Sequence, residues 1–445
     1  MTIYQQQIED SFNAVVDALL QQLQDQEHLT IGLIAEDSHF VRFNRGRVRQ
    51  NGLVKDGNLK LTLLRDQREL ALSLPFTGER EIDLPLAIDY LQQLQQEVNQ
   101  VPPNPYAVMP LDGESSYAVY RGELLPSDRV AEQILSPIQG LDFVGFYAGG
   151  MVIRATANSK GQKHWFATET FLIDYSLYQG EQAVKGIYSD RTWHQSTYQQ
   201  KIARDRAGLE ILTQTAKTIP RGSYRVYFAP SAVASLLATI EGEFSAAKLH
   251  QRTSALVNLW QGHKYLSSRL TLGENYRSGV VPRFNEGGEL APLNLPVLVE
   301  GKLVNTIVNR RSAAEYAATA NGGNRYESLR APEISPGDLP PDQVLSALDR
   351  GIYLSDLHYL NWSDRPTGRI TGMTRFACFW VEEGKPVAPI APMRFDDSLY
   401  NFWGEHLCAL TTDREFIPET STYEHRSIGG RLVPGMIVDN FTFTI

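Results

Sequence analysis

Apolar positions repeat at two different periods along the chain, and the change of period predicts its helices and strands. Over residues 5–27, apolar side chains recur at every third or fourth position, which predicts an amphipathic helix. Over residues 29–76 the period becomes two, and polar pairs such as Asp37-Ser38 and Asp56-Gly57 separate short apolar runs. This spacing predicts an antiparallel meander of short strands.

The next stretch, up to residue 217, alternates between the two periods. Residues 101–116 contain four prolines and are predicted to be a linker. Paired Gly149-Gly150 predict a turn or bulge, because glycine relaxes the backbone limits that keep a strand straight. Helices are predicted at 84–98 and at 195–217, and a further helix is predicted to begin after an N-cap at Ser127. Strands are predicted at 143–157, 163–177 and 183–188.

The second half is organised around one predicted strand and helix. Residues 224–228 form an apolar run, Pro230 interrupts it, and Ser231 is expected to cap a helix that runs to Phe244. A shorter helix is expected at 254–266. The remainder consists of predicted short strands at 295–300, 302–308, 351–357, 376–382, 385–389 and 436–445, with hairpin turns at 299–302 and 382–385, and a long aperiodic loop at 321–341.

These elements predict an α+β fold. A chain of 445 residues is long enough for two or three domains, and we expect boundaries that give segments 1–100, 101–217 and 218–445, the last one β-rich with a central helix. The formal net charge of -9 argues against a general nucleic-acid binder. The N-terminus lacks a signal-peptide pattern and no apolar run is long enough for a membrane span, so we expect a cytoplasmic protein.

Motifs for autonomous catalysis are missing from the sequence. None of the nine histidines is followed by glutamate, and no two lie four or five residues apart. The sequence contains no G-x-S-x-G and no phosphate-binding glycine motif. Cys378 lies in an alternating apolar run and is expected to be a small core residue, whereas Cys408 stays unassigned. A metal site assembled from distant residues remains open.

A family resemblance begins directly after the central helix. Glu241-Gly242-Glu243-Phe244, behind a strand and helix, resembles the E-G-D-F segment of the TldD/PmbA family. Other segments resemble motifs of that family in the same order along the chain. They are Val41 to Asn44 with Arg47 to Gln50, Ala320 to Asn324, Gly351 to Asp356, Pro366 to Gly372 and Phe379 to Gly384.

The resemblance also implies what this chain lacks. In the metallopeptidase branch of the family, the helix carries His-Glu-x-x-x-His, and the corresponding positions here are Val233, Ala234 and Ala238. None of these side chains can bind a metal or move a proton. The resemblance therefore implies a PmbA-like (TldE-like) member with no catalytic residue, metal or cofactor of its own. We expect Val233 and Ala238 to be partly or wholly buried.

The resemblance further implies a peptidase-related role in a complex. It suggests a homodimer, or a heterodimer with a TldD-like metallopeptidase subunit, acting on unfolded peptides or peptide precursors without direct nucleic-acid or membrane contact. The polar loop Asn321, Gly322, Gly323, Asn324 and Arg325 is the predicted substrate-binding segment. A non-enzymatic peptide-binding or regulatory protein, corresponding to the label "modulator of DNA gyrase", and an autonomous metallopeptidase are the alternatives.

Overall fold

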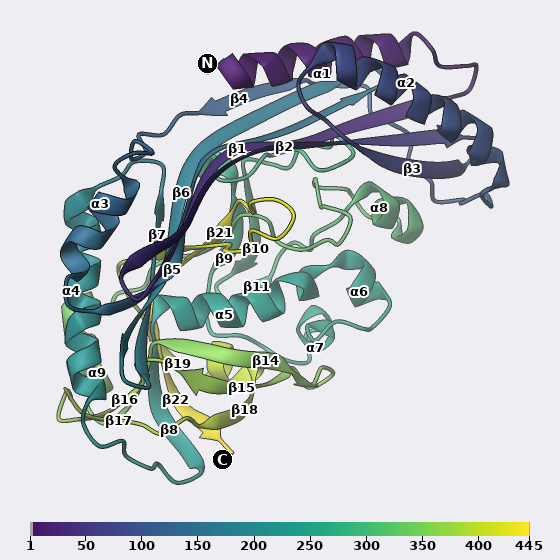
Figure 1. The fold of residues 1–445 in the computed structure, drawn as a ribbon. Coiled ribbons are helices and arrows are strands. Elements are labelled where there is room, and N and C mark those ends of the chain that lie inside the picture. The colour runs from purple at the N-terminus through teal and green to yellow at the C-terminus, as the bar shows by residue number, and fades with distance from the viewer. Residues whose placement is uncertain (1–2, 445) are drawn as a thin grey trace.

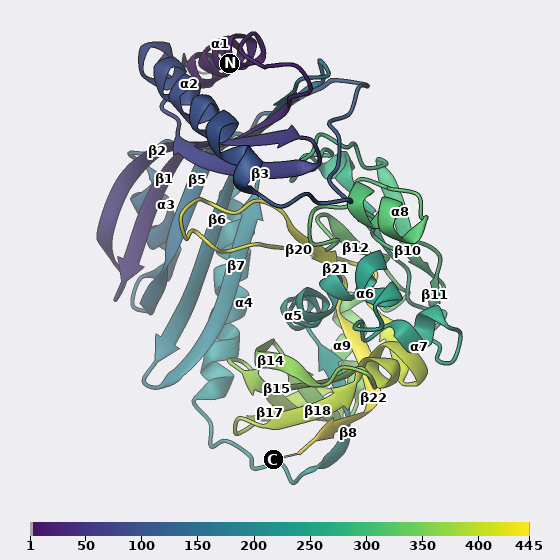
Figure 2. The same cartoon turned by 90° about the vertical axis from the view of Figure 1, so that its right-hand side faces the viewer.

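The computed structural model describes residues 3–444 and has an α+β fold built on three sheets (Figures 1 and 2). The N-terminal half forms one sheet in the order β3-β2-β1-β5-β6-β4, with β7 paired to β6. Its neighbours are antiparallel except for β4 and β6. The strands are β1 (His28–Asn44), β2 (Arg47–Arg65), β3 (Arg68–Pro75), β4 (Ser116–Tyr120), β5 (Asp142–Asn158), β6 (Lys163–Gln179) and β7 (Gln182–Asp190).

Helices cover one face of this sheet, and the other face looks toward the C-terminal half (Figure 2). Leu29, Ile31 and Leu33 of β1 pack against the helices at one end, and Val41 and Phe43 do so at the other end. These odd-numbered positions share one side because successive strand residues point to opposite faces. The covering helices are α1 (Ile3–Leu20), α2 (Arg80–Glu97), α3 (Val130–Leu135) and α4 (Gln195–Leu212).

The long strands correct the prediction of a meander of short ones. β1 runs through Asp37-Ser38, β2 through Asp56-Gly57 and β5 through Gly149-Gly150 without a turn. Gly150 has a φ of 147°, and a Cβ there would lie 2.0 Å from the Asp37 carbonyl oxygen. The glycine therefore permits close approach of neighbouring strands, and the predicted turn or bulge at this position is wrong.

One further N-terminal expectation, the N-cap at Ser127, is wrong in the structure. Helix α3 starts at Val130 with Arg129 at its N-cap, so Ser127 is not the cap. Strands from both expected segments, 1–100 and 101–217, belong to the same sheet, because β1 pairs with β5 along almost its whole length.

The C-terminal half contains two sheets. The smaller one has the order β11-β10-β9-β12-β21-β20, and the larger one has the order β14-β15-β18-β22-β8-β13-β16-β17, with β19 paired to β22. The smaller sheet consists of β9 (Leu272–Asn275), β10 (Asn294–Val299), β11 (Lys302–Leu303), β12 (Pro332–Ile334), β20 (Glu415–Pro418) and β21 (Gly430–Val433). The larger consists of β8 (Gly222–Phe228), β13 (Gly351–Leu354), β14 (Asp356–Asp364), β15 (Arg369–Arg375), β16 (Phe379–Glu382), β17 (Lys385–Pro389), β18 (Arg394–Ser398), β19 (Leu407–Leu410) and β22 (Met436–Phe443).

Helix α5 (Pro230–Ile240) contacts both C-terminal sheets and is the central helix that the sequence predicts (Figure 1). It continues as a short 3₁₀ turn over Glu241–Phe244. Pro230 occupies its first turn and Ala229 the N-cap, so Ser231 does not cap the helix. Instead, the Ser231 hydroxyl donates a hydrogen bond of 2.7 Å to Asp356.

Short elements complete this half. They are α6 (Ala246–His250), α7 (Val257–Trp260), α8 (Arg310–Tyr316) and α9 (Val344–Leu348). The helix expected at 254–266 is wrong in length, since only α7 is helical there. Both predicted hairpins are confirmed, because Val299 pairs with Lys302 and Glu382 pairs with Lys385. Among residues 3–444, no helix combines the length and apolar character that crossing a bilayer would require.

Candidate functional site

The three helix positions singled out in the sequence do not form a metal centre. Val233 and Ala234 are buried at 0% and 2% exposure, within the core between the two C-terminal sheets. Ala238 is exposed, so the expectation that it is buried is wrong. Within residues 3–444, no group of three or more histidine, cysteine, aspartate or glutamate side chains is arranged to hold a metal ion.

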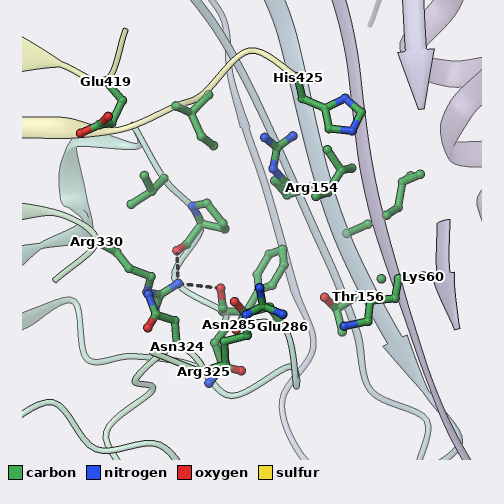
Figure 3. Close-up of a pocket in the computed structure, with 18 of the residues that line it drawn as sticks. Lys60, Arg154, Thr156, Asn285, Glu286, Asn324, Arg325, Arg330, Glu419 and His425 are labelled. Carbon is green, nitrogen blue, oxygen red and sulfur yellow. Dashed lines mark hydrogen bonds between the residues drawn. The ribbon is translucent and has the colours of Figure 1, made fainter. Parts of the chain in front are cut away.

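A cavity of about 900 Å³ lies between the inner face of the N-terminal sheet and loops of the C-terminal half (Figure 3). One wall comes from β1, β2, β3 and β5, and includes Lys60, Arg154 and Thr156. The opposite wall comes from three C-terminal segments, at 281–286, 324–332 and 419–431. Glu241, at the C-terminal end of α5, also faces this space. The central helix and both halves of the chain thus meet at the cavity.

The predicted substrate-binding loop reaches the cavity with only part of its length. Asn324 and Arg325 line the cavity wall. Asn321 instead holds the loop in place, because its side chain accepts a hydrogen bond from the Val308 amide and donates one to the Thr306 carbonyl. Gly322 and Gly323 are buried beneath this surface. Of the five predicted substrate-binding residues, Asn324 and Arg325 are therefore the two that line the cavity.

The glycines of this loop are explained by packing. Gly322 has a φ of 80°, and a Cβ there would come within 2.5 Å of the Ala291 backbone. Its amide donates to Glu289, and the Gly323 carbonyl accepts from the Asn285 side chain. The loop is therefore fastened to the 285–291 segment, which presents Asn324 and Arg325 from a supported base.

An ion-pair cluster closes the end of the cavity next to α5. Arg431 donates two hydrogen bonds, of 2.9 and 3.0 Å, to the Glu241 carboxylate, and it also pairs with Glu419. Burial raises the pKa of Glu241 to about 7, although Arg431 acts in the opposite direction. Sequence reasoning noticed Glu241 only as part of a motif. Its main partner, Arg431, lies 190 positions further along the chain, which local pattern cannot reveal.

The second glutamate of the E-G-E-F segment has a structural role. Glu243 is 2% exposed and forms ion pairs with Lys248 and Arg365. Its second oxygen accepts a hydrogen bond of 2.7 Å from the Ala255 amide. The two acidic residues therefore face different environments, Glu241 the cavity and Glu243 the protein interior.

The pKa of Glu241 leads to a stability prediction. A folded-state pKa near 7, above the ordinary value of about 4.3, means that the folded protein retains a proton that the unfolded chain loses. This contribution is fully present below about pH 4.3 and disappears as pH rises through 7. We expect Glu241→Gln to flatten the decline in unfolding free energy over this range, measured by urea titration at several pH values.

Glu286→Gln is the matched control, since Glu286 is an exposed carboxylate on the same cavity. It should leave the slope unchanged. The opposite result would be an unfolding free energy of the wild type that rises with pH relative to that of Glu241→Gln. It would mean that the attraction of Arg431 outweighs burial and that the Glu241 pKa lies below its ordinary range.

Neither cysteine has the properties of a nucleophile. Cys378 is buried as expected, and burial raises the pKa of its thiol to about 12. The Cys408 thiol donates a hydrogen bond to Asp439, and its pKa is also raised, mainly by burial. A low thiol pKa is what makes a cysteine reactive at neutral pH, so both side chains are inert in this structure.

The fold and this cavity define a class of protein in which a long-stranded N-terminal sheet faces a β-rich domain carrying a central helix. Residues 221–445 match the family model described as the PmbA/TldA metallopeptidase C-terminal domain. Because this match covers half of the chain, the protein belongs to the PmbA/TldD family.

Solved structures share the whole fold. A putative modulator of DNA gyrase from Thermotoga maritima and TldE from Thermococcus kodakarensis each have a TM-score of 0.77 and 14% identity. They cover 97% and 98% of this chain and 100% of their own. A putative modulator of DNA gyrase from Bacteroides thetaiotaomicron has a TM-score of 0.77 and 16% identity, with 98% of both chains covered. No curated protein matches the chain.

The metal implied by the family description does not fit the residues of this chain. Two of the three helix positions carry apolar side chains within the core, and the third is an alanine. A metal ion in a peptidase needs nitrogen, sulfur or oxygen ligands, and none of these side chains supplies one.

Proposed function

We propose that this chain is the metal-free, PmbA-like (TldE-like) subunit of a cytoplasmic peptidase complex that acts on unfolded peptides or peptide precursors. The observation that carries the proposal is the contrast within α5. The three positions that carry metal ligands in the metallopeptidase branch are apolar, whereas Glu241 at the end of the helix lines a cavity of about 900 Å³. The chain has kept a space for a ligand next to this helix without the side chains that would hold a metal.

The cavity has the features that an extended peptide requires. Asn285, Asn324 and Thr156 supply polar groups for backbone recognition, while Val281 and Ile428 supply apolar surface. Ligand sites in proteins commonly combine an apolar lining with a few polar groups that fix orientation. The volume of about 900 Å³ is at the upper end of such sites and suits several peptide residues.

The partner in this proposal is a TldD-like subunit, with a homodimer as the form adopted by the chain alone. One of the solved structures with this fold bears the name TldE. A subunit without metal ligands contributes to hydrolysis only if another chain supplies them.

A second candidate is a peptide-binding or regulatory protein that acts without cleavage. The cavity favours it, because both of its walls come from a single chain. Two of the solved structures carry the description of a putative modulator of DNA gyrase. The net charge of -9 gives no support for direct contact with DNA. An autonomous metallopeptidase is the third and least favoured candidate, for want of ligands.

Mixing the purified chain with a zinc-loaded TldD-like metallopeptidase tests the proposal. We expect the chain alone to hold no stoichiometric metal and to leave unfolded peptides intact. With the partner it should form a complex in size-exclusion chromatography with light scattering, and that complex should cleave peptides in a chelator-sensitive reaction.

Asn324→Ala combined with Arg325→Ala should preserve the complex and reduce its peptidase activity, because both residues line the cavity. Chelator-sensitive cleavage by the chain alone would support the autonomous enzyme. Peptide binding without any complex would support the second candidate.

A further inference from the structure

The sheet wall of the cavity presents two cations, Lys60 and Arg154, that form no ion pair at contact distance with any described carboxylate. Lys60 on β2 is exposed, and Arg154 on β5 is half-buried. Arg154 donates one hydrogen bond, from Nη1 to the Ile153 carbonyl at 2.9 Å. A guanidinium carries five N–H donors, so most of those on Arg154 are available to a ligand.

The strand register brings these two cations to one hollow. Gly32 on β1 lies opposite Lys60 on β2 and opposite Thr156 on β5. A Cβ at Gly32 would meet no atom within 4 Å, so the middle strand leaves open space between the two flanking side chains. Lys60 and Thr156 are therefore about 10 Å apart at their Cα atoms, two strand spacings. Figure 3 shows Lys60, Arg154 and Thr156 on this wall, facing Asn324 and Arg330.

Apolar surface adjoins the hollow. Ile34 follows Gly32 by two residues on β1 and therefore points to the same face of the sheet. It lies directly opposite Arg154, lines the cavity and is 37% exposed. Val281, Pro282 and Ile428 line the cavity from the C-terminal half. The wall thus offers a cationic group and an apolar group at neighbouring positions, which suits a ligand that is both anionic and apolar.

The charge around Arg154 favours an added anion. Burial lowers the pKa of Arg154 to about 10, so the side chain is still charged at neutral pH. The charged groups that act on it are Glu36, which attracts it, and Arg426, which repels it. Arg154 and Arg426 thus share the attraction of one carboxylate, Glu36, and an anion bound at Arg154 would add a second negative charge beside them.

We propose that Lys60, Arg154 and Thr156 form a carboxylate-binding site for peptides, with an apolar peptide side chain packed against Ile34. This inference rests on the proposed function, because it assumes that the cavity receives a peptide. It specifies the substrate class as peptides with a carboxylate beside an apolar residue. The carboxylate is either the C-terminal one or that of an acidic side chain, since both present the same group to an arginine.

Fluorescence anisotropy with three labelled hexapeptides tests the site on the isolated full-length chain. One peptide has a free carboxylate after a terminal leucine, the second is its amide, and the third is an amide with glutamate before the leucine. We expect the free acid to bind about tenfold more tightly than the plain amide, or better, as a charge-assisted hydrogen bond implies. The third peptide shows whether a side-chain carboxylate replaces the terminal one.

Lys60→Gln and Arg154→Gln should each reduce the preference for carboxylate over amide, and together they should abolish it. Lys60 is exposed, so its variant keeps the test valid even if Arg154→Gln folds poorly. Arg49→Gln, an exposed arginine on the same strand but outside the cavity, should keep the full preference.

Equal binding of all three peptides by the wild type, binding of none, or an undiminished preference in Lys60→Gln would overturn the inference. Complex formation with a TldD-like subunit is measured separately, and we expect it not to depend on these residues because they lie inside the cavity. A functional complex with no carboxylate preference would therefore reject this site while leaving the proposed function standing.

Discussion

Replacing Arg426 with alanine should lower the free energy of unfolding by about 3–5 kcal/mol, the usual cost of removing one member of a buried charged group. Arg426 is 3% exposed and lies in the loop 419–429 between β20 and β21. Its guanidinium donates to Ser38, Thr170 and the Gly150 carbonyl, on three different strands of the N-terminal sheet. Its backbone amide donates to Glu36.

The size of this effect follows from what the variant leaves behind. Glu36 is 2% exposed, and Arg426 is a main source of positive charge near it. Alanine at 426 would also leave the hydroxyls and carbonyls that Arg426 now contacts without their donor. Such orphaned polar groups cost more than the lost hydrogen bonds contribute when formed.

Denaturant unfolding measures the loss, and Tyr423→Ala is the matched control. Tyr423 belongs to the same loop but is 85% exposed, so its removal should change stability by about 0.5 kcal/mol or less. Hydrogen exchange should show faster opening of residues 419–429 in Arg426→Ala only. A loss below about 1 kcal/mol would mean that the loop does not fasten the two halves together.

Arg426 also explains why three strand breaks were predicted in the wrong places. Asp37-Ser38, Asp56-Gly57 and Gly149-Gly150 have the composition of turns, yet they lie side by side in the sheet, with Ser38 opposite Gly150 and Glu36 opposite Asp56. The loop 419–429 docks on this row, since Arg426 contacts Ser38 and the His425 ring lies 3.1 Å from the Asp56 carboxylate. These polar and small residues contact a loop that lies far along the chain, with Arg426 388 positions from Ser38 and 276 from Gly150, so no local pattern distinguishes them from turns.

The parts of the fold that could be predicted depend on local pattern. The alternation of buried and exposed residues in β1 and the helical period of apolar residues in α5 can both be recognised within a short segment of sequence. The short strands β9, β12, β20 and β21 form a sheet only through distant pairing. The candidate site shares this limit. Asn324 and Arg325 were predicted from a loop, but Lys60, Arg154 and Arg431 enter the cavity through the arrangement of the sheets.

Restoring the metallopeptidase motif on α5 should damage the fold without creating a metal site. Val233→His should lower the free energy of unfolding by about 3 kcal/mol, because it places a polar ring in a closely packed, fully buried position. Ala238→His should cost below about 1 kcal/mol, mostly from helix propensity, because position 238 is exposed. Urea unfolding of this pair compares the same new side chain at both ligand positions.

The full restoration adds Ala234→Glu, which places a carboxylate at a position with 2% exposure. Burial opposes ionisation of that carboxylate and protonation of a histidine at 233, so neither side chain is stabilised unless a metal reaches it. We expect the triple variant to unfold at lower urea than Val233→His and to hold no stoichiometric zinc by elemental analysis. Stoichiometric zinc in a stably folded triple variant would instead show that the ligand geometry survives in α5 and that only the side chains were lost.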